Sequence, residues 1–190
     1  MYRRMMALML AALMVAGLFT ALAAQTPDVQ LFVLDIPACR DNGEILSGIA
    51  PGASKEMVEH AGIVFMPEPF HTQEMAEKKL TSETWQVENS TAAFSLSDIR
   101  MHSALFQFVN DRLVNITLNL PDADSIAPVE ALLRETLDEP STMDTPAGGT
   151  DILYWAWEQD TYSVRVGLLT HLEGDKPVKA NVQISYQLLD

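Results

Sequence analysis

The sequence has a single cysteine, Cys39, and few basic residues, and both shortages limit what the protein can be. One cysteine cannot form an intramolecular disulfide, so stability has to come from a hydrophobic core. The 12 Lys and Arg residues stand against 26 Asp and Glu residues, for a net charge of −14. Nucleic acids and anionic membrane surfaces select basic patches, so this charge argues against both as partners. A content of 48% hydrophobic and 20% charged residues predicts a packed globular domain.

Motifs that mark common active sites are also missing. The chain has no Gly-x-Ser-x-Gly, no P-loop, no Gly-x-Gly-x-x-Gly and no His-Glu-x-x-His. His71 and Glu74 supply at most half of a metal site, whereas zinc needs three or four ligands. Asp122 and Asp124 are better explained as helix-capping residues than as calcium ligands. The sequence therefore predicts no enzyme, no cofactor and no metal site, although an active site assembled from distant loops stays an alternative.

The first 23 residues have the pattern of a secretory signal peptide. A basic start, MYRR, precedes a long apolar run that ends at Ala21-Leu22-Ala23, an A-x-A cleavage site. This predicts export through the general secretion route to the periplasm or the cell exterior, with no membrane insertion after cleavage. The alternative is an uncleaved membrane anchor, because the run is nearly long enough to span a bilayer. Cleavage would remove two arginines and leave 10 basic and 26 acidic residues, a net charge of about −16.

Cys39 raises a separate question, because IPAC (36–39) superficially resembles a lipoprotein signal. Asp35 interrupts the apolar run just before it, and the signal-like apolar segment ends well upstream. A free or buried thiol is therefore the preferred interpretation of Cys39, and lipidation is the alternative.

Periodicity and turn residues divide the rest of the chain into elements. A helix after Ser54 should end at Gly62, and the polar stretch 71–80 suggests a short helix capped by Thr72. Residues 104–120 predict a β-hairpin that turns at Asn110-Asp111. The other expected elements are a strand or extended segment at 29–39, a turn at 40–44, short strands around 85–87 and 94–96, a helix at 124–137, a loop at 141–151, and strands at 152–158, 162–169 and 178–188.

Two apolar patterns identify the expected core faces. In the hairpin, Val114, Ile116, Leu118 and Leu120 alternate with polar residues. In the helix at 124–137, four residues at helical spacing form one apolar face, which we expect to pack on the sheet that contains Ile184: Ile126, Val129, Leu133 and Leu137.

The order of elements, helix then strands and again helix then strands, predicts an α+β fold. We expect two tandem helix-then-antiparallel-sheet units forming a layered sandwich. The domain boundaries that follow are 1–23 for the signal peptide and 24–190 for a single α+β domain. Within that domain the two units should cover about 29–120 and 121–190.

Two short stretches resemble the module shared by the outer-membrane assembly lipoprotein BamE and the β-lactamase inhibitor proteins. Gly52, Ser54, Val58 and Gly62 match its helix entry, helix valine and closing glycine, although the glycine comes a residue early and no proline follows. In the second half, LDEP (137–140) resembles the usual Leu-Gly-x-Pro exit with Asp in place of Gly, and Trp155-Ala156-Trp157 stands at the aromatic strand. The resemblance implies a helix-and-hairpin fold and a binding role in the cell envelope.

The strand at 152–158 differs from its neighbours because it is apolar on both faces. Trp155 and Trp157 share one face, whereas Tyr154 lies on the other. The first interpretation is packing between the two units, and the second is a binding surface formed by these three aromatic residues. The resulting hypothesis is a non-catalytic binding, inhibitory or assembly-accessory protein with a protein partner in the cell envelope. The alternative is an enzyme or small-ligand carrier with a site between the two sheets.

Overall fold

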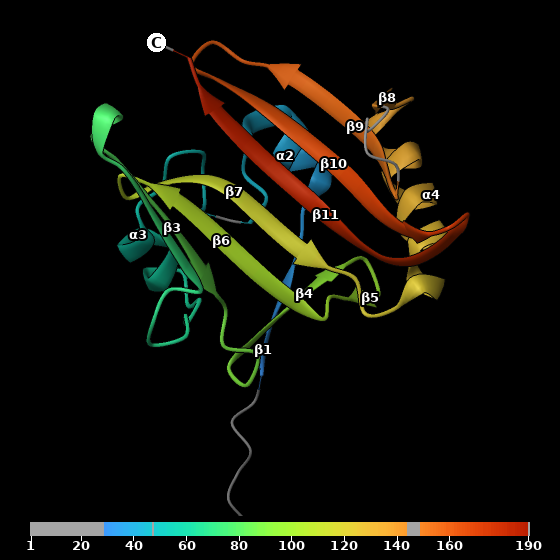
Figure 1. Ribbon diagram of the computed structural model, residues 1–190, viewed down its shortest axis with the longest axis horizontal. Helices are drawn as coiled ribbons and strands as arrows, with labels where there is room; N and C mark the ends of the chain where they lie inside the picture. The colour runs from blue at the N-terminus through green and yellow to red at the C-terminus, as the bar shows by residue number, and fades with distance from the viewer. Residues whose placement is uncertain (1–28, 47, 144–148, 190) are drawn as a thin grey trace, which may run out of the picture.

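The computed structural model describes residues 29–46, 48–143 and 149–189, so the predicted signal peptide (1–23) lies outside the described residues. Figure 1 shows a broad antiparallel sheet with helices and a smaller sheet behind it. The large sheet has eight strands in the order β2-β3-β6-β7-β11-β10-β9-β8, and the small sheet has three in the order β1-β4-β5. The strands are β1 (Gln30–Val33), β2 (His71–Met75), β3 (Leu80–Gln86), β4 (Ala92–Leu96), β5 (Ile99–Arg100), β6 (Ser103–Val109), β7 (Arg112–Asn119), β8 (Ser141–Met143), β9 (Thr150–Glu158), β10 (Tyr162–Glu173) and β11 (Lys176–Leu188).

The expectation of two tandem units with separate sheets is wrong. β7, from the first half of the chain, pairs antiparallel with β11, from the second half, with Ile116 opposite Ile184. This pairing joins the two halves into one continuous sheet. About half of the described residues are in strands and only about a fifth are in helices. The second helix therefore does not begin a separate layer, because the strands that follow it extend the sheet already formed by the strands before it.

The β6–β7 hairpin is confirmed, with its turn at the expected two residues. Asn110 and Asp111 both have positive φ, 47° and 60°, which is the backbone that a tight two-residue hairpin turn requires. The expected alternation fails at Val114, because the register shifts between Gln107 and Phe108 and a bulge puts Leu113 in the core instead. Ile116, Leu118 and Leu120 are buried as predicted.

Within the described residues, three α-helices and the small sheet cover one face of the large sheet. The helices are α2 (Ile36–Asn42), α3 (Lys55–His60) and α4 (Ile126–Leu137). In Figure 1 they lie behind the large sheet, as does β1. The buried residues of α4 are the four predicted ones, Ile126, Val129, Leu133 and Leu137, and they belong to the same hydrophobic core as the fully buried Ile184.

Local capping explains where the first two helices begin. Asp35 accepts a hydrogen bond from the Ala38 amide at 2.9 Å, so 36–42 is a helix and not the predicted strand and turn. Ser54 caps α3 as predicted, accepting from the Met57 amide at 3.2 Å. Gly62, with φ of +96°, follows the last turn of α3, as its predicted role as a helix stop requires.

The predicted helix at 71–80 is wrong. Residues 71–75 form β2, which pairs with β3, and only 76–78 form a single 3₁₀ turn. β2 has little of its surface buried, so its side chains carry no apolar stripe for sequence periodicity to detect. Pairing with β3, a tertiary interaction, determines the backbone here.

Candidate functional site

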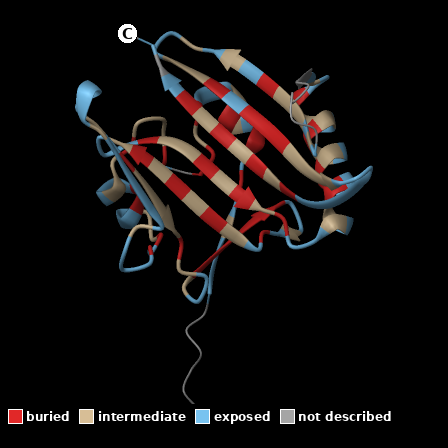
Figure 2. Ribbon diagram, in the orientation of Figure 1, coloured by how far each residue is buried: buried red, intermediate tan, exposed pale blue. Residues whose placement is uncertain are grey.

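The large sheet has one face turned away from the helices and the small sheet, called here the open face. In Figure 2, buried and intermediate residues alternate along its central strands, because successive side chains point to opposite sides of the sheet. No helix or strand of the described residues covers the open face. This face is therefore a broad surface available to a ligand or partner.

The three aromatic residues singled out from sequence do not lie together. Trp155 is only 4% exposed on the core face, and its Nε1–H donates to the backbone carbonyl of Asp138, just after α4, at 3.0 Å. Trp157 is partly buried against the same core. Tyr154 lies on the open face, where it helps to form a hollow. The structure thus places two of the predicted binding residues in the core and one on the exposed sheet.

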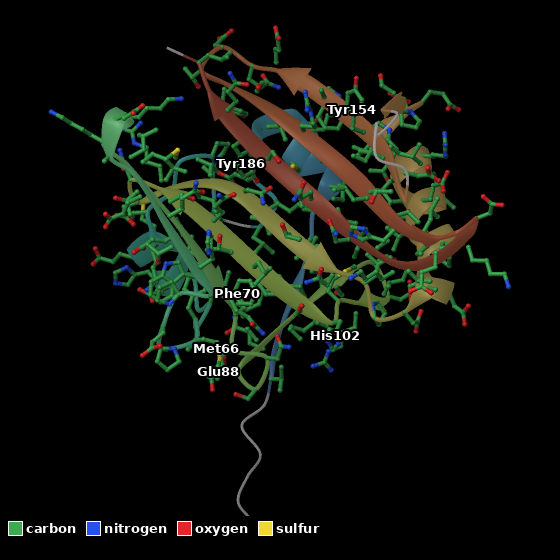
Figure 3. All side chains as sticks on the ribbon, viewed as in Figure 1. Met66, Phe70, Glu88, His102, Tyr154 and Tyr186 are labelled. Carbon is green, nitrogen blue, oxygen red and sulfur yellow. The ribbon has the colours of Figure 1, made fainter. Side chains whose placement is uncertain are left out.

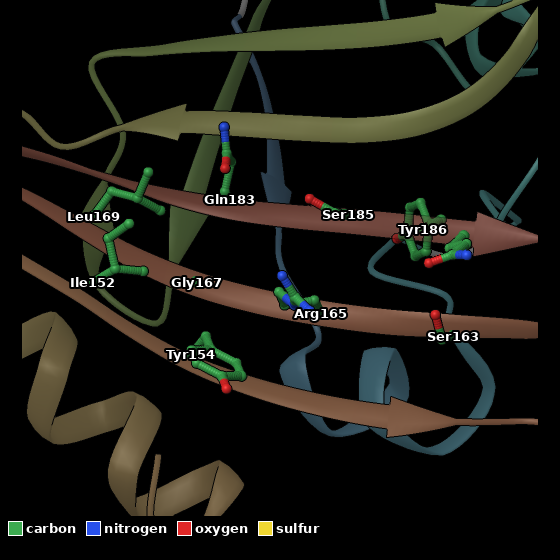
Figure 4. A pocket seen from close by; sticks show the side chains of 10 residues that line it. Ile152, Tyr154, Ser163, Arg165, Gly167, Leu169, Gln183, Ser185 and Tyr186 are labelled. Carbon is green, nitrogen blue, oxygen red and sulfur yellow. The ribbon is translucent and has the colours of Figure 1, made fainter. Parts of the chain in front are cut away.

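The hollow beside Tyr154, called here the Tyr154 hollow, has a volume of about 270 Å³. Figure 4 shows its side chains on three neighbouring strands, and Figure 3 places Tyr154 and Tyr186 within the whole molecule. The hollow is lined by residues of β9, β10 and β11: Ile152, Tyr154, Ser163, Arg165, Gly167, Leu169, Gln183, Ser185, Tyr186 and Gln187. Arg165 is the only charged residue in this set.

Strand register explains why these residues meet. Gly167 is paired with Tyr154 on β9 and with Gln183 on β11. In this row across the three strands, the tyrosine ring and the glutamine amide are therefore separated by a position that has no side chain. A Cβ atom at Gly167 would lie 3.2 Å from Cδ1 of Leu169, which is tighter than an ordinary van der Waals contact. Glycine at this position therefore leaves the centre of the row open and gives the neighbouring Leu169 side chain room.

Arg165 lies two residues before Gly167 on β10, on the same face of the sheet, and is paired with Ser185 and Ala156. Its guanidinium carbon is 5.1 Å from the centre of the Tyr154 ring, within the range of a cation–π contact. The ion pairs among the described residues are Arg40–Asp41, Lys55–Glu59, Arg134–Glu130 and Arg134–Glu139, so none of them includes Arg165. The Arg165 guanidinium in the hollow therefore contacts the Tyr154 ring and is not paired with a carboxylate of the described residues.

Next to the hollow, the open face is polar and ordered by side-chain hydrogen bonds. The Ser185 hydroxyl donates to Asn115 Oδ1 at 3.0 Å, and the Asn119 amide donates to Ser103 Oγ at 2.8 Å. On the same face but farther from the hollow, Gln107 of β6 donates to Ser82 Oγ of β3 at 2.9 Å. These bonds link side chains on adjacent strands, so this part of the face is arranged before any partner arrives.

A wider groove of about 900 Å³ lies between α4 and the ends of β9 and β10. It combines apolar residues such as Ile126 and Leu172 with three carboxylates, Glu130, Asp151 and Asp175. Its acidic character follows the composition of the whole chain. The Tyr154 hollow differs, because none of the residues that line it is acidic.

Behind the sheet, Cys39 and Tyr186 form a buried polar contact. Cys39 is fully buried, and burial raises the pKa of its thiol from 9.0 to about 12, against a smaller opposite effect of the Tyr186 hydroxyl. Burial also raises the pKa of Tyr186 well above 10, and the Cys39 thiol adds to that shift. The Tyr186 hydroxyl has no well-aligned hydrogen bond to any described residue, so its interaction with the Cys39 thiol is weak. A thiol with so high a pKa is not an activated nucleophile.

The predicted half-site for a metal is not assembled. His71 and Glu74 lie three residues apart on β2, where side chains at that spacing point to opposite faces. Within the described residues, no group of three or more His, Cys, Asp or Glu side chains is placed to hold a metal ion.

The helices that the structure describes are all too short or too polar to cross a membrane.

Arg165 and Gly167 were missed by sequence reasoning. Arg165 stands between Val164 and Val166 in a strand whose other face is apolar, which places it on the open side, but nothing in the sequence says that Tyr154 is its neighbour. That information comes from the β9–β10 register. Comparisons with protein-family models, with curated proteins and with solved structures found no match. The resemblance to the BamE and β-lactamase-inhibitor module therefore stays a prediction.

Proposed function

We propose that this is a non-catalytic, exported binding protein that docks a protein partner of the cell envelope on its open face. The observation that carries the proposal is the Tyr154 hollow, in which an exposed arginine lies against a half-buried tyrosine in the middle of an uncovered sheet. Export rests on the signal-like residues 1–23 alone.

The chemistry of the open face supports docking. Protein interfaces are depleted in charged residues at their centre and enriched in Tyr and Arg, which supply much of the binding energy. The strands around the hollow present Asn, Gln, Ser and Thr side chains, among them Asn115, Thr117 and Gln183. Hydrogen bonds already hold several of these side chains in place, so binding would lose little side-chain entropy.

The alternative, an enzyme or ligand carrier with a site between the two sheets, is not favoured by the packing there. The ring of Phe94, from the small sheet, lies 5.9 Å from that of Phe106, from the large sheet. Phe65 packs against Phe106 from another side, with ring centres 5.6 Å apart. These aromatic contacts fill part of the space between the two sheets, and the hollow of about 400 Å³ that remains there, lined by Phe94, Arg100 and Ala104 among others, contains no carboxylate or thiol.

Site-specific photo-crosslinking tests the docking proposal. A photoreactive phenylalanine analogue is placed at Gln183, beside the hollow, and in a matched control at the exposed Glu135 on α4, behind the sheet. In envelope extract from the source cells, the Gln183 position should give one discrete crosslinked protein and the Glu135 position should not.

Tyr154→Ala in the Gln183 crosslinking background should lower the yield about tenfold or more, because interface tyrosines concentrate binding energy. Circular dichroism and melting temperature verify that each variant is folded. Identical products from the two positions, or no product from Gln183, would contradict docking on the open face.

A further inference from the structure

The positive charge of Arg165 is unusual for this chain, which has 26 acidic and 12 basic residues. In such a chain a solvent-exposed arginine has many possible carboxylate partners. No ion pair or hydrogen bond among the described residues uses the Arg165 guanidinium, which lies against the Tyr154 ring. Its N–H donors are therefore free to bind a group from outside the chain.

Glu158 is an exposed acidic residue on the same face. It is two positions along β9 from Ala156, the direct partner of Arg165, and so occupies a diagonal position. Tyr154 occupies the opposite diagonal, and the guanidinium lies over its ring, 5.1 Å from the centre. A contact with an aromatic ring uses the π face and occupies none of the N–H donors of a guanidinium. Because Arg165 lines the hollow and is paired with Tyr154 and not with Glu158, its donors are available to a group that enters the hollow.

The surroundings of Arg165 define what the hollow can accept. Gln183 and Ser163 add neutral donors, and neither side chain is hydrogen-bonded to another described residue. Ile152 and Leu169 form an apolar end. A volume of about 270 Å³ is at or below the lower end of small-molecule sites, so it suits one side chain better than a whole ligand.

We propose that the Tyr154 hollow recognises a carboxylate, carried by a Glu or Asp side chain of the protein partner. The proposal rests on the docking function above and names the group that the open face would bind. Arginine pairs with carboxylates through two parallel hydrogen bonds, which gives both attraction and orientation. One guanidinium with neutral donors matches a singly charged group, whereas a phosphate dianion would leave a negative charge uncompensated in an acidic protein. An acidic side chain that projects from a folded surface can reach a hollow in an open sheet.

Nuclear magnetic resonance titration of the purified, ¹⁵N-labelled protein tests this assignment. The probe is N-acetyl-glutamate-N-methylamide, and the matched control is the corresponding glutamine compound, which has the same shape without the charge. The carboxylate probe should shift the backbone amides of Arg165 and Gly167 saturably, at millimolar concentrations. The glutamine compound should bind at least tenfold more weakly.

Two variants verify that the charge of Arg165 is responsible. Arg165→Gln should reduce carboxylate binding at least tenfold. Glu158→Gln should strengthen it a few-fold, because it removes the competing acidic residue. Since Arg165 is exposed, neither change should alter the amide spectrum away from the open face.

Four results would overturn the proposal: equal binding of the two probes, unchanged binding in Arg165→Gln, tighter binding of inorganic phosphate, or tighter binding of N-acetyl-leucine. The last of these would assign the hollow to a chain terminus or a free acid instead of a side chain.

The two proposals can fail separately. If crosslinking from Gln183 persists undiminished in Arg165→Gln, docking stands and carboxylate recognition is wrong. If the carboxylate probe binds but Gln183 gives no crosslink, the hollow is a small-ligand site and docking is wrong.

Discussion

Replacing Trp155 by alanine should be among the most destabilising single changes in the protein. The side chain is 4% exposed, and a buried aromatic side chain removes about 150–250 Å² from water. If roughly 150 Å² of that is lost on truncation, about 25 cal/mol per Å² gives close to 4 kcal/mol. The Asp138 carbonyl also loses the hydrogen bond from Nε1, worth about 1 kcal/mol. Partial collapse of the site offsets part of this, so we expect a loss of about 3–5 kcal/mol.

Urea denaturation followed by circular dichroism measures this loss without relying on tryptophan emission. With a slope of about 2 kcal/mol per molar urea, Trp155→Ala should move the midpoint down by about 1.5–2.5 M. Trp155→Phe keeps most of the apolar area and loses the donor, so it should cost only about 1–2 kcal/mol.

The matched control is Tyr154→Ala, the adjacent residue on the open face, which should cost about 1 kcal/mol or less. If Tyr154→Ala were as destabilising as Trp155→Ala, the assignment of the two residues to opposite faces would be wrong. A cost below about 1.5 kcal/mol for Trp155→Ala would show that the ring is not in the core.

Two further changes test the core from other sides. Leu133→Ala, in the buried face of α4, should lower the free energy of unfolding by about 2–5 kcal/mol, measured by calorimetry. Gln183→Ala, on the open face, should change it by no more than about 0.5 kcal/mol. Equal shifts in melting temperature would show that the side chains of β11 have been assigned to the wrong faces. Burial raises the pKa of the Cys39 thiol from 9.0 to about 12. Between these two pH values the unfolded chain loses the thiol proton, whereas the native chain keeps it. The contribution of the thiol to the free energy of unfolding is therefore complete below pH 9 and falls as the pH rises from 9 towards 12. Cys39→Ala should therefore flatten the stability curve above pH 9 by about 1.4 kcal/mol per pH unit, and an unchanged slope in equilibrium unfolding would show that the native thiol titrates normally.

Local signals in the sequence predicted the elements whose start, end or turn is set by the side chain or φ angle of one or two residues. Ser54 and Gly62 mark the ends of α3, and Asn110-Asp111 marks the hairpin turn. Strand-like segments between turn residues located β9, β10 and β11, and helical spacing identified the buried face of α4. Asp35 was an equally good capping signal for α2, but the apolar residues before it favoured a strand.

Tertiary pairing determined what the sequence could not show. The residues of β2 have no apolar stripe and are strand only because β3 lies beside them. The bulge at Val114 is invisible in a pattern that alternates correctly through it. The union of the two halves depends on β7 meeting β11, and the Tyr154 hollow depends on the β9–β10 register. Pattern analysis can assign a residue to a face, but not choose its neighbour on the next strand.

The position of β11 has a consequence for how the protein reaches its native state. β11, the last strand among the described residues, lies between β7 and β10 in the interior of the large sheet. Ser185 and Asn115, which are hydrogen-bonded across this junction, are 70 residues apart in the sequence. Such distant contacts slow folding, because a long loop must close before they form. Without residues 176–188 the sheet would be two separate pieces with exposed edges at β7 and β10. The large sheet therefore cannot be completed before residues 176–188 have been synthesised, however early the other strands form.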